Sequence, residues 1–323
     1  MNILVTGGAG YIGSHTCKIL AKHDFIPVTF DNLENGHEWV VKWGPLEIGD
    51  VRDSERLREV IEKYQPQAIM HFAAYIEVGE SVKDPGKFHD NNVVGTANLL
   101  QVMQESGIQN IVYSSSCAVY GLPSEVPITE SCRIAPENPY GKTKADSENI
   151  LKDYHLNHGI HSVSLRYFNA AGADLEGDIG EAHDPESHLI PIVLTKGALD
   201  GKEVDIYGDD YDTPDGTCVR DYIHVIDLAE AHILALKRLI SGGSSSVYNL
   251  GNGQSYSVKE VVESIKRLTG KKFDVRVSSR RPGDVPILVA DATKAYKELG
   301  WKTRYSDLET ILGTAWDWIR SKD

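Results

Sequence analysis

The residues with the clearest chemical potential in this sequence are a tyrosine and a lysine four positions apart. Tyr140 and Lys144 form the only Tyr-x-x-x-Lys pattern in the chain. On a helix, positions i and i+4 share one face, so the two side chains project together. An ammonium beside a tyrosine favours the phenolate, and we expect it to lower the pKa of Tyr140 from its reference value of about 10 towards the working pH. Such a tyrosine can act as a general acid and base towards a hydroxyl group.

A serine is expected to join this pair at the end of a strand. Ser116 lies in the segment Ser-Ser-Ser-Cys-Ala-Val-Tyr-Gly over residues 114–121, which closes the fourth predicted strand. Ligands of parallel sheets bind at the carboxyl ends of strands, so Ser116 should meet Tyr140 beside a bound cofactor. A lone Tyr-x-x-x-Lys is more often a surface pair, but the three residues together predict a catalytic site.

Three glycines near the N-terminus indicate a dinucleotide site. Gly7, Gly10 and Gly13 form a Gly-x-x-Gly-x-x-Gly pattern directly after the first predicted strand and at the start of a helix. Glycine there allows a tight turn and lets the backbone approach a pyrophosphate on the helix N-terminus. Asp31 ends the second strand 18 residues after Gly13. A carboxylate in that place accepts hydrogen bonds from ribose hydroxyls and repels the 2′-phosphate of NADP, so the predicted cofactor is NAD.

Loops after neighbouring strands should flank the same cofactor. Asp50 and Val51 follow an apolar turn, and Phe72, Ala73 and Ala74 end the third predicted strand. We expect these residues beside the adenine and the pyrophosphate. For Asp50, an exposed acidic loop residue is an equally good interpretation.

Strands and helices that alternate in the first half of the chain must position these residues. Strands are expected at 2–6, 26–30, 68–71, 110–114 and 161–166, and helices at 11–22, 54–63, 87–106 and 140–158. This alternation predicts an α/β fold, a Rossmann-type doubly wound parallel sheet with a smaller α/β substrate-binding domain. We expect residues 1–169 to form the NAD-binding domain, with about 218–244 folded back onto it. Residues 170–217 and 245–323 should form the second domain.

The composition is that of an ordinary globular protein. The 323 residues are 41% hydrophobic and 25% charged, and 33 basic against 47 acidic residues leave a net charge of −14 with no basic run. This charge argues against a nucleic-acid partner or a membrane surface. The start of the chain reads as a strand rather than a signal peptide, and no stretch approaches the roughly 18 apolar residues of a membrane span. Four cysteines without Cys-x-x-Cys spacing fit a reducing compartment, so we expect a cytoplasmic protein.

Ordered motifs along nearly the whole chain carry a resemblance to a known family. Besides the segments above they are Thr6–His15, Asp31-Asn-Leu33, Val78–Val82, Asp90–Val93, Pro139–Lys142, Arg166–Asn169, Asp215–His224, Tyr248–Gly251 and Arg280–Asp284. On these motifs the sequence resembles the extended short-chain dehydrogenases/reductases, and within them the UDP-galactose 4-epimerases.

The resemblance implies roles for individual residues. Tyr140 would be the base, Ser116 would hydrogen-bond the reacting hydroxyl, and Lys144 would tune Tyr140 and bind the nicotinamide ribose. The other cofactor contacts implied are Tyr11, Ile12, Asn32, Asn35, Asn91, Ser114 and Tyr167. The UDP-sugar contacts implied, besides Ser116 and Tyr140, are Asn169, His188, Leu189, Tyr207, Arg220, Tyr222, Arg281, Asp284 and Leu288.

The implied activity is the interconversion of UDP-galactose and UDP-glucose through a transient 4-keto sugar, with NAD retained. A 4,6-dehydratase or decarboxylase on the same scaffold is disfavoured, because those relatives place acidic residues where Cys117 and Ala118 stand. A non-catalytic scaffold protein is disfavoured because the tyrosine and the lysine are both intact. The resemblance also implies a homodimer in which helices 87–106 and 140–158 pack between two subunits.

Three positions depart from the family pattern. Ile76 stands where a lysine reaches the cofactor, and His188 replaces a common asparagine at the substrate phosphate. Leu288 stands where members limited to non-acetylated sugars carry a tyrosine, so a dual-specificity enzyme that also accepts UDP-GlcNAc and UDP-GalNAc is the alternative hypothesis.

No metal site is expected. The densest ligand-like group is Glu181, His183, Asp184 and His188, which lacks a regular metal spacing and is interpreted as a polar loop near the substrate.

Overall fold

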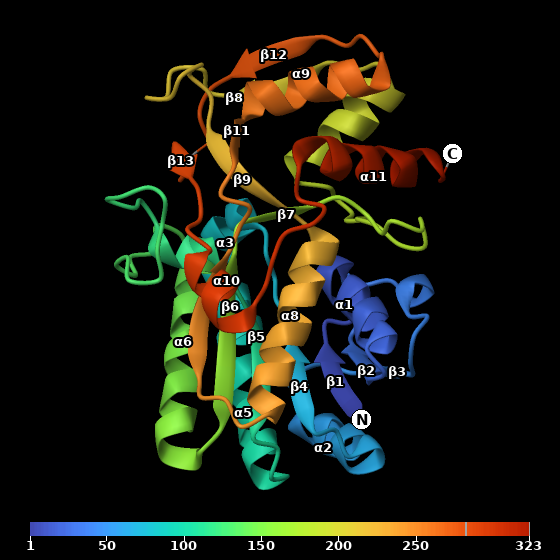
Figure 1. Cartoon of the computed structure of the whole chain (residues 1–323), viewed down its shortest axis with the longest axis vertical. Helices are drawn as coiled ribbons and strands as arrows, with labels where there is room; N and C mark the ends of the chain where they lie inside the picture. The colour runs from blue at the N-terminus through green and yellow to red at the C-terminus, as the bar shows by residue number, and fades with distance from the viewer. Residues whose placement is uncertain (282, 323) are drawn as a thin grey trace.

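A seven-stranded parallel sheet forms the centre of the protein in the computed structural model, which describes residues 1–281 and 283–322 (Figure 1). The strand order is β10-β6-β5-β4-β1-β2-β3. Their bounds are β1 Asn2–Thr6, β2 Ile26–Asp31, β3 Leu46–Ile48, β4 Ala68–His71, β5 Asn110–Ser116, β6 His161–Tyr167 and β10 Ser246–Leu250. The order reverses between β1 and β4, so the loops after these two strands border the crevice in which such sheets bind ligands.

Helices cover both faces of the sheet, as the uninterrupted apolar strands require. In β1, Ile3 and Val5 face the layer made by α1 (Tyr11–Lys22) and α8 (Val225–Ile240). Leu4 faces the opposite layer, made by α2 (Ser54–Tyr64), α5 (Gly95–Glu105) and α6 (Pro139–His158). Figure 1 shows α8 beside α1, although more than 200 residues separate their starts.

Short helices lead into α5 and follow β5. They are α3 (Val78–Lys83), α4 (Pro85–His89) and a π-helix over Asp90–Val94 before α5, and a 3₁₀ helix over Cys117–Tyr120 after β5. Another 3₁₀ helix, Glu38–Val40, lies between β2 and β3. The predicted helix 87–106 is therefore three consecutive pieces.

A second group of elements lies beyond the carboxyl ends of the sheet (Figure 1). Strand β9 (Val219–His224) pairs with β7 (Asn169–Ala171), β11 (Ser255–Ser257) and β13 (Ile287–Leu288). Its other elements are the pair β8 (Val204–Tyr207) and β12 (Val275–Ser278), with α7 (Leu189–Ile192), a π-helix over Val193–Leu199, α9 (Val258–Thr269) and α11 (Leu308–Arg320). A buried cluster that includes Val193, Val262 and Leu312 packs these helices together.

The placement of β10 and α10 bears on the domain division expected from the sequence. Within residues 245–323, which are expected in the second domain, β10 lies at the edge of the large sheet beside β6, and α10 (Thr293–Leu299) packs on β10. Strand β9 pairs outside the large sheet, so of residues 218–244 only α8 folds back onto it. We propose two domains with these changes. The sequence did not reveal β10 because its five residues carry no periodic signal and gain their place only through parallel pairing with β6.

Among the described residues, no helix has the length and apolar character needed to cross a membrane.

Candidate active site

The glycine turn after β1 packs so closely that side chains are excluded. Gly7 has φ +72°, and a Cβ on it would lie 2.5 Å from the Ala73 nitrogen. A Cβ on Gly13 would lie 2.2 Å from the Gly7 carbonyl oxygen. Helix α1 begins after Gly10 with no side-chain N-cap and no acidic residue in its first turn, so its N-terminal dipole is uncompensated by side chains. This turn meets the geometric and electrostatic requirements of a pyrophosphate cradle, with Tyr11 and Ile12 as its first helical residues.

The end of β2 carries the carboxylate expected at the ribose. Asp31 is buried, and its two oxygens accept hydrogen bonds from the Ala9 nitrogen at 3.0 Å and the Leu33 nitrogen at 2.9 Å. Burial raises the pKa of Asp31, and these two hydrogen bonds partly oppose that rise. The carboxylate is therefore held rigidly beside the start of α1.

Asp50 pairs with an arginine rather than standing alone. Arg52 bonds both oxygens of Asp50, at 2.9 Å and 2.7 Å, and Asn32 donates to it at 3.2 Å. The Arg52 hydrogen bond is the main reason that the pKa of Asp50 falls to about 2. Val51 is buried against Gly95.

The loop after β4 lies against the glycine turn. The nitrogens of Phe72 and Ala73 both donate to the Thr6 carbonyl, at 2.8 Å and 3.1 Å, and Ala74 follows them half-buried. Buried Asn91 donates to the Asn92 side chain at 3.0 Å. The structure thus brings the loops after β1 and β4 together, as the sequence analysis expected.

The three predicted catalytic residues converge at the carboxyl end of β5. Tyr140 and Lys144 lie one turn apart at the start of α6, and the Lys144 ammonium is 5.9 Å from the Tyr140 ring centroid. Lys144 donates to the Ser114 carbonyl at 2.8 Å. Ser116, the last residue of β5, acts on Tyr140 as a hydrogen-bonding partner that favours its phenolate. All three side chains are at least nine-tenths buried.

The structure does not show the predicted lowering of the Tyr140 pKa by Lys144. Burial raises the pKa of Tyr140 well above 10, and the Ser116 hydroxyl only partly opposes this. Burial also lowers the pKa of Lys144 from 10.5 to about 7, with Glu148 opposing. Removal from water penalises both charged forms, and the lysine is directed to a carbonyl rather than to the phenol.

A tyrosine on β6 completes this end of the sheet. The Tyr167 hydroxyl and the Ser114 hydroxyl lie 2.6 Å apart, and burial raises the pKa of Tyr167 to about 12. The Ser114 carbonyl and side chain thus hold Lys144 and Tyr167 respectively.

Sequence reasoning missed residues that position Tyr140. The Ser81 hydroxyl accepts a hydrogen bond from the Tyr140 nitrogen at 3.2 Å, and the Asn92 side chain donates to Thr143 at 3.0 Å. Ile76 packs in the cluster that contains Tyr75, Phe88 and Tyr140. No sequence signal marks these contacts, because the partners are far apart in the sequence. More than 50 positions separate Ser81 from Tyr140, and more than 50 separate Asn92 from Thr143. Ile76, where a lysine was noted as missing, therefore adds to the burial of Tyr140.

Predicted substrate residues of the second group gather around β9 and β13. The Arg220 guanidinium donates to the Val285 carbonyl at 2.7 Å and lies 4.0 Å from the Asp284 carboxylate. Leu288 is paired with Arg220 in register and packs against the same buried cluster as Cys117, one residue after Ser116. Arg220 and Leu288 are thus brought to the catalytic end of β5.

The remaining predicted substrate residues lie farther along the same elements. Asn169 donates to the Asp221 carbonyl at 3.1 Å, and Tyr222 is buried in the second core. The Arg281 guanidinium stacks 4.1 Å from the ring centroid of Tyr207, which is 37% exposed. The Arg280–Asp284 motif includes Pro282, which lies outside the described residues.

His188 and Leu189 mark the start of α7, with His188 as its N-cap. The Nδ1 atom of His188 contacts the Glu181 carboxylate, so this ring nitrogen is not available to a substrate. The polar group predicted here does form, but with Glu186 in place of Asp184.

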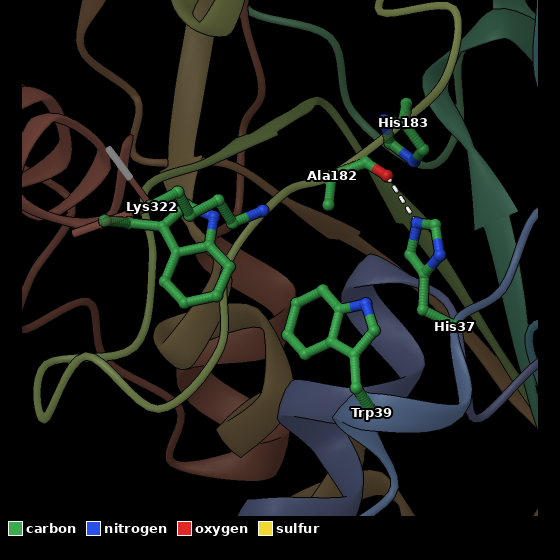
Figure 2. A pocket seen from close by; sticks show the side chains of 6 residues that line it. His37, Trp39, Ala182, His183 and Lys322 are labelled. Atoms are coloured by element: carbon green, nitrogen blue, oxygen red, sulfur yellow. Dashed lines mark hydrogen bonds between the residues drawn. The ribbon is translucent and has the colours of Figure 1, made fainter. Parts of the chain in front are cut away.

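An open pocket of about 590 Å³ is lined by His37, Trp39, Ala182, His183, Trp318 and Lys322 (Figure 2). Trp39 and Trp318 stack there with ring centroids 5.7 Å apart, and His37 Nε2 donates a hydrogen bond to the Ala182 carbonyl at 2.6 Å. A neighbouring smaller cavity is lined by Gly10, Tyr11 and Asn35 together with Ala9, Ser14, His37, Val40, Gly180, Ala182 and His183. Among the predicted cofactor residues, Asn35 is thus placed beside the glycine turn.

Known proteins resemble this chain over almost its full length. Residues 3–251 match the NAD dependent epimerase/dehydratase family. A UDP-glucose 4-epimerase of Rhizobium meliloti (strain 1021) is 55% identical over 317 residues, which are 98% of this chain and 96% of that relative. The crystal structure of UDP-glucose 4-epimerase from Brucella ovis in complex with NAD is 52% identical with a TM-score of 0.94, covering 98% of this chain and 97% of that one.

A third similar protein was solved with both ligands. The UDP-glucose 4-epimerase from Bifidobacterium longum in complex with NAD⁺ and UDP is 39% identical, with a TM-score of 0.94 over 99% of this chain and 98% of that one. At these identities and coverages the likeness extends to sequence and fold together.

Proposed function

The chain belongs to the NAD dependent epimerase/dehydratase family, and from this premise and the geometry of the site we propose that it is a UDP-glucose 4-epimerase. It interconverts UDP-galactose and UDP-glucose through a transient 4-keto sugar, and NAD is its cofactor. The observation that carries the proposal is the convergence of Ser116, Tyr140 and Lys144 at one end of β5, in a chain 55% identical to a UDP-glucose 4-epimerase.

The chain offers the features that NAD binding requires. The glycine turn at Gly7 and Gly13 leaves no room for side chains, α1 presents an uncapped N-terminus, and Asp31 stands at the end of β2. We assign the pyrophosphate to the turn and the adenosine ribose to Asp31. Asn35, Asn91 and the loop after β4 would line the remaining cofactor surface.

Proton transfer is assigned to Tyr140. Its phenolate would take the proton of the sugar 4-hydroxyl, with Ser116 holding that hydroxyl, while the hydride leaves C4. Bound NAD would supply the acceptor that takes this hydride and later returns it, and its positive ring would favour the phenolate. Lys144, fixed by the Ser114 carbonyl, would bind the nicotinamide ribose.

Epimerisation requires a tightly held diphosphate and a loosely held sugar. Arg220, Arg281 and Asp284 are assigned to UDP, since arginine forks suit diphosphate oxygens. The 4-keto sugar turns over about this anchor and receives the hydride on its other face, while Tyr140 returns the proton. The other assigned contacts are Asn169, His188, Leu189, Tyr207, Tyr222 and Leu288.

A dehydratase mechanism needs a further acid or base beside Ser116. Burial raises the pKa of Cys117 to about 12, which keeps it a neutral thiol, and Ala118 has no ionisable group. This observation supports the epimerase over a dehydratase.

We further propose that two copies pair through α5 and α6 and that the enzyme works in the cytoplasm. All four cysteines are free thiols, which suits a reducing compartment.

The direct test follows the 4-epimer by NMR when purified protein, without added NAD, is incubated with UDP-galactose. Formation of UDP-glucose together with transient absorbance of reduced NAD is expected. Absence of conversion even with added NAD would refute the proposal. The same assay with UDP-GalNAc addresses the dual-specificity alternative, which the relatives described above do not favour. If UDP-GalNAc were converted, Leu288 would be the residue to vary next.

A further inference from the structure

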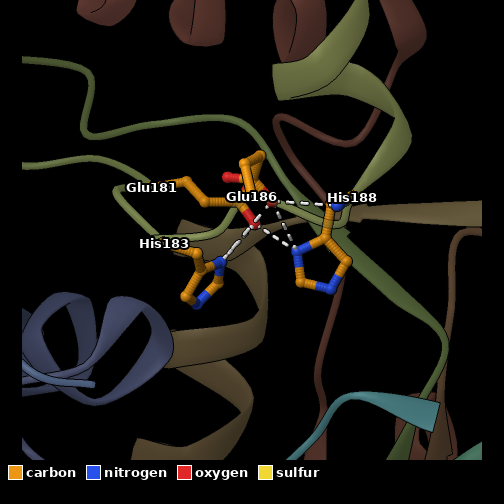
Figure 3. A group of neighbouring side chains, drawn as sticks. All are labelled: Glu181, His183, Glu186 and His188. Atoms are coloured by element: carbon orange, nitrogen blue, oxygen red, sulfur yellow. Dashed lines mark hydrogen bonds and ion pairs between the residues drawn. The ribbon is translucent and has the colours of Figure 1, made fainter. Parts of the chain in front are cut away.

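Four side chains converge at one point of the loop before α7, and only His188 among them is also assigned to the substrate site above (Figure 3). They are Glu181, His183, Glu186 and His188, and the four possible ligand atoms lie within 4.8 Å of one another. Figure 3 shows the two imidazole rings turned toward the two carboxylates between them.

The donor set has a defined geometry. The His183 Nδ1 lies 3.2 Å from Glu181 Oε1 and 3.8 Å from Glu186 Oε1. The His188 Nδ1 lies 3.6 Å from Glu186 Oε1 and contacts Glu181 Oε1 directly. Two imidazole nitrogens and two carboxylate oxygens suit Zn²⁺ and similar transition ions, whereas Mg²⁺ and Ca²⁺ prefer oxygen ligands throughout.

The donors are partly withdrawn from water and have no lysine or arginine partner among the described residues. The Glu181 side chain is only 7% exposed, and His183 Nδ1 is a buried atom without a well-formed hydrogen bond. Within residues 1–281 and 283–322, neither carboxylate forms an ion pair with a lysine or an arginine. Two buried or half-buried carboxylates therefore depend on the histidines alone or on an ion.

A neighbouring acidic cluster differs from this group because a lysine lies within it. Asp174, Glu176 and Asp178 also meet, but the Lys18 ammonium lies among them at 2.7 Å, 2.8 Å and 2.7 Å. That cluster already contains its cation. It provides a matched control on the same stretch of chain.

Outer contacts hold the donors in place. The Trp318 indole donates to the Glu181 carbonyl at 3.0 Å, and His37 bonds the Ala182 carbonyl at 2.6 Å. The Tyr11 ring meets the His183 ring edge-on at 6.2 Å. Such supporting contacts orient metal ligands in proteins.

We propose that Glu181, His183, Glu186 and His188 form a binding site for one zinc-class divalent cation. The ion joins the loop 181–188 into one rigid unit between the start of α1 and the start of α7. Its role is structural, and it revises the expectation from sequence that the chain holds no metal.

The test is metal binding by the whole, tag-free protein after removal of ions with a chelator. Added Co²⁺ is expected to give the visible absorption of a four-coordinate site, and Zn²⁺ to abolish it at about one ion per chain. His183→Gln should weaken Zn²⁺ binding by more than about 100-fold, since losing even an outer partner of a ligand costs about 10- to 100-fold. Asp178→Asn should leave binding unchanged.

A second variant guards against misfolding. Glu186→Gln keeps an oxygen for the Ser187 and His188 nitrogens, which Glu186 now accepts at 2.8 Å each, but removes the charge. It should fold and yet show no rise in melting temperature with Zn²⁺, while the parent protein does. The proposal would be overturned if the parent protein gave no cobalt spectrum. It would also be overturned if His183→Gln and Glu186→Gln gave a spectrum as strong as that of the parent. These readouts do not depend on epimerase activity, so they can fail or succeed independently of the proposed function.

Discussion

Burial and hydrogen bonding compete at the tyrosine to which proton transfer is assigned. The Tyr140 phenol is buried beside Ser116, and burial holds its pKa well above 10 while no cofactor is bound. The neutral phenol is thus the resting form, and forming the phenolate depends on added positive charge nearby.

Removing the Tyr140 hydroxyl should abolish catalysis but not cofactor binding. We expect Tyr140→Phe to lower kcat by about a thousandfold, the range typical of general acid–base catalysis. Bound NAD, released by denaturation and quantified, should match the parent. Tyr154→Phe, on the same helix but remote from Ser116, is the control and should keep activity. A Tyr140→Phe enzyme with normal kcat would remove Tyr140 from the mechanism.

Lys144 gives a pH-dependent stability with a definite sign. Its folded pKa is about 7 against an ordinary value of 10.5, so between these values the unfolded chain holds the proton more tightly. Stability should therefore rise with pH across this window, while below about pH 7 the full cost of the buried charge remains.

Urea unfolding of the NAD-free protein measures this effect. Between about pH 7 and about pH 9 the Lys144 contribution should be on the order of 2 kcal/mol. Lys144→Met should lack this rise. An identical pH dependence in parent and variant would mean that the lysine keeps its ordinary pKa in the folded protein.

At the scale of elements, the junction of β1 and α1 is the most tightly constrained. Gly13 lies on the first turn of α1 directly over the Gly7 carbonyl, and Gly7 packs on the loop after β4. Three elements thus meet without intervening side chains, which lets a ligand approach the helix N-terminus.

Gly13→Ala should cost about 1–3 kcal/mol and release NAD, because its Cβ would lie 2.2 Å from a backbone oxygen that cannot move freely. Gly10→Ala is the matched control for stability, since its Cβ would lie 3.4 Å from the same oxygen. Chemical unfolding and NAD content measure both. Equal stability losses in the two variants would contradict the steric argument.

At the scale of the molecule, the two faces of the sheet have different surroundings. Helices α1 and α8 are tied to the second group of elements, for example where Asp227 accepts hydrogen bonds from Arg304, Tyr305 and Ser306. Helices α5 and α6 carry exposed side chains, such as Gln101 on α5 and Lys152 on α6. Val94, next to α5, is 37% exposed.

If α5 and α6 pair between subunits, a charge at Val94 should separate the dimer. We expect Val94→Arg to shift the sedimentation coefficient from dimer to monomer at the concentration where the parent is dimeric, because an unpaired charge is costly in an interface. Leu175→Arg is the control, since Leu175 is 47% exposed and follows Asp174, which pairs with Lys18 of α1. A monomeric parent protein would refute the dimer.

Local patterns in the sequence predicted the elements that carry much of the proposed cofactor and catalytic site. The first strand and helix have the bounds 2–6 and 11–22 that were predicted, and Tyr140 and Lys144 share a face of α6. These features depend on residues within one or two turns of each other, so glycine spacing and helical periodicity report them directly.

Only the tertiary structure decided what depends on distant partners. It determined that β10 joins the large sheet, that Glu186 rather than Asp184 completes the histidine cluster, and that the Ser81 hydroxyl supports Tyr140. It also reversed the expected direction of the Tyr140 pKa shift. A pKa depends on the loss of water around a group, and that loss is created by segments that the chain brings together only when it folds.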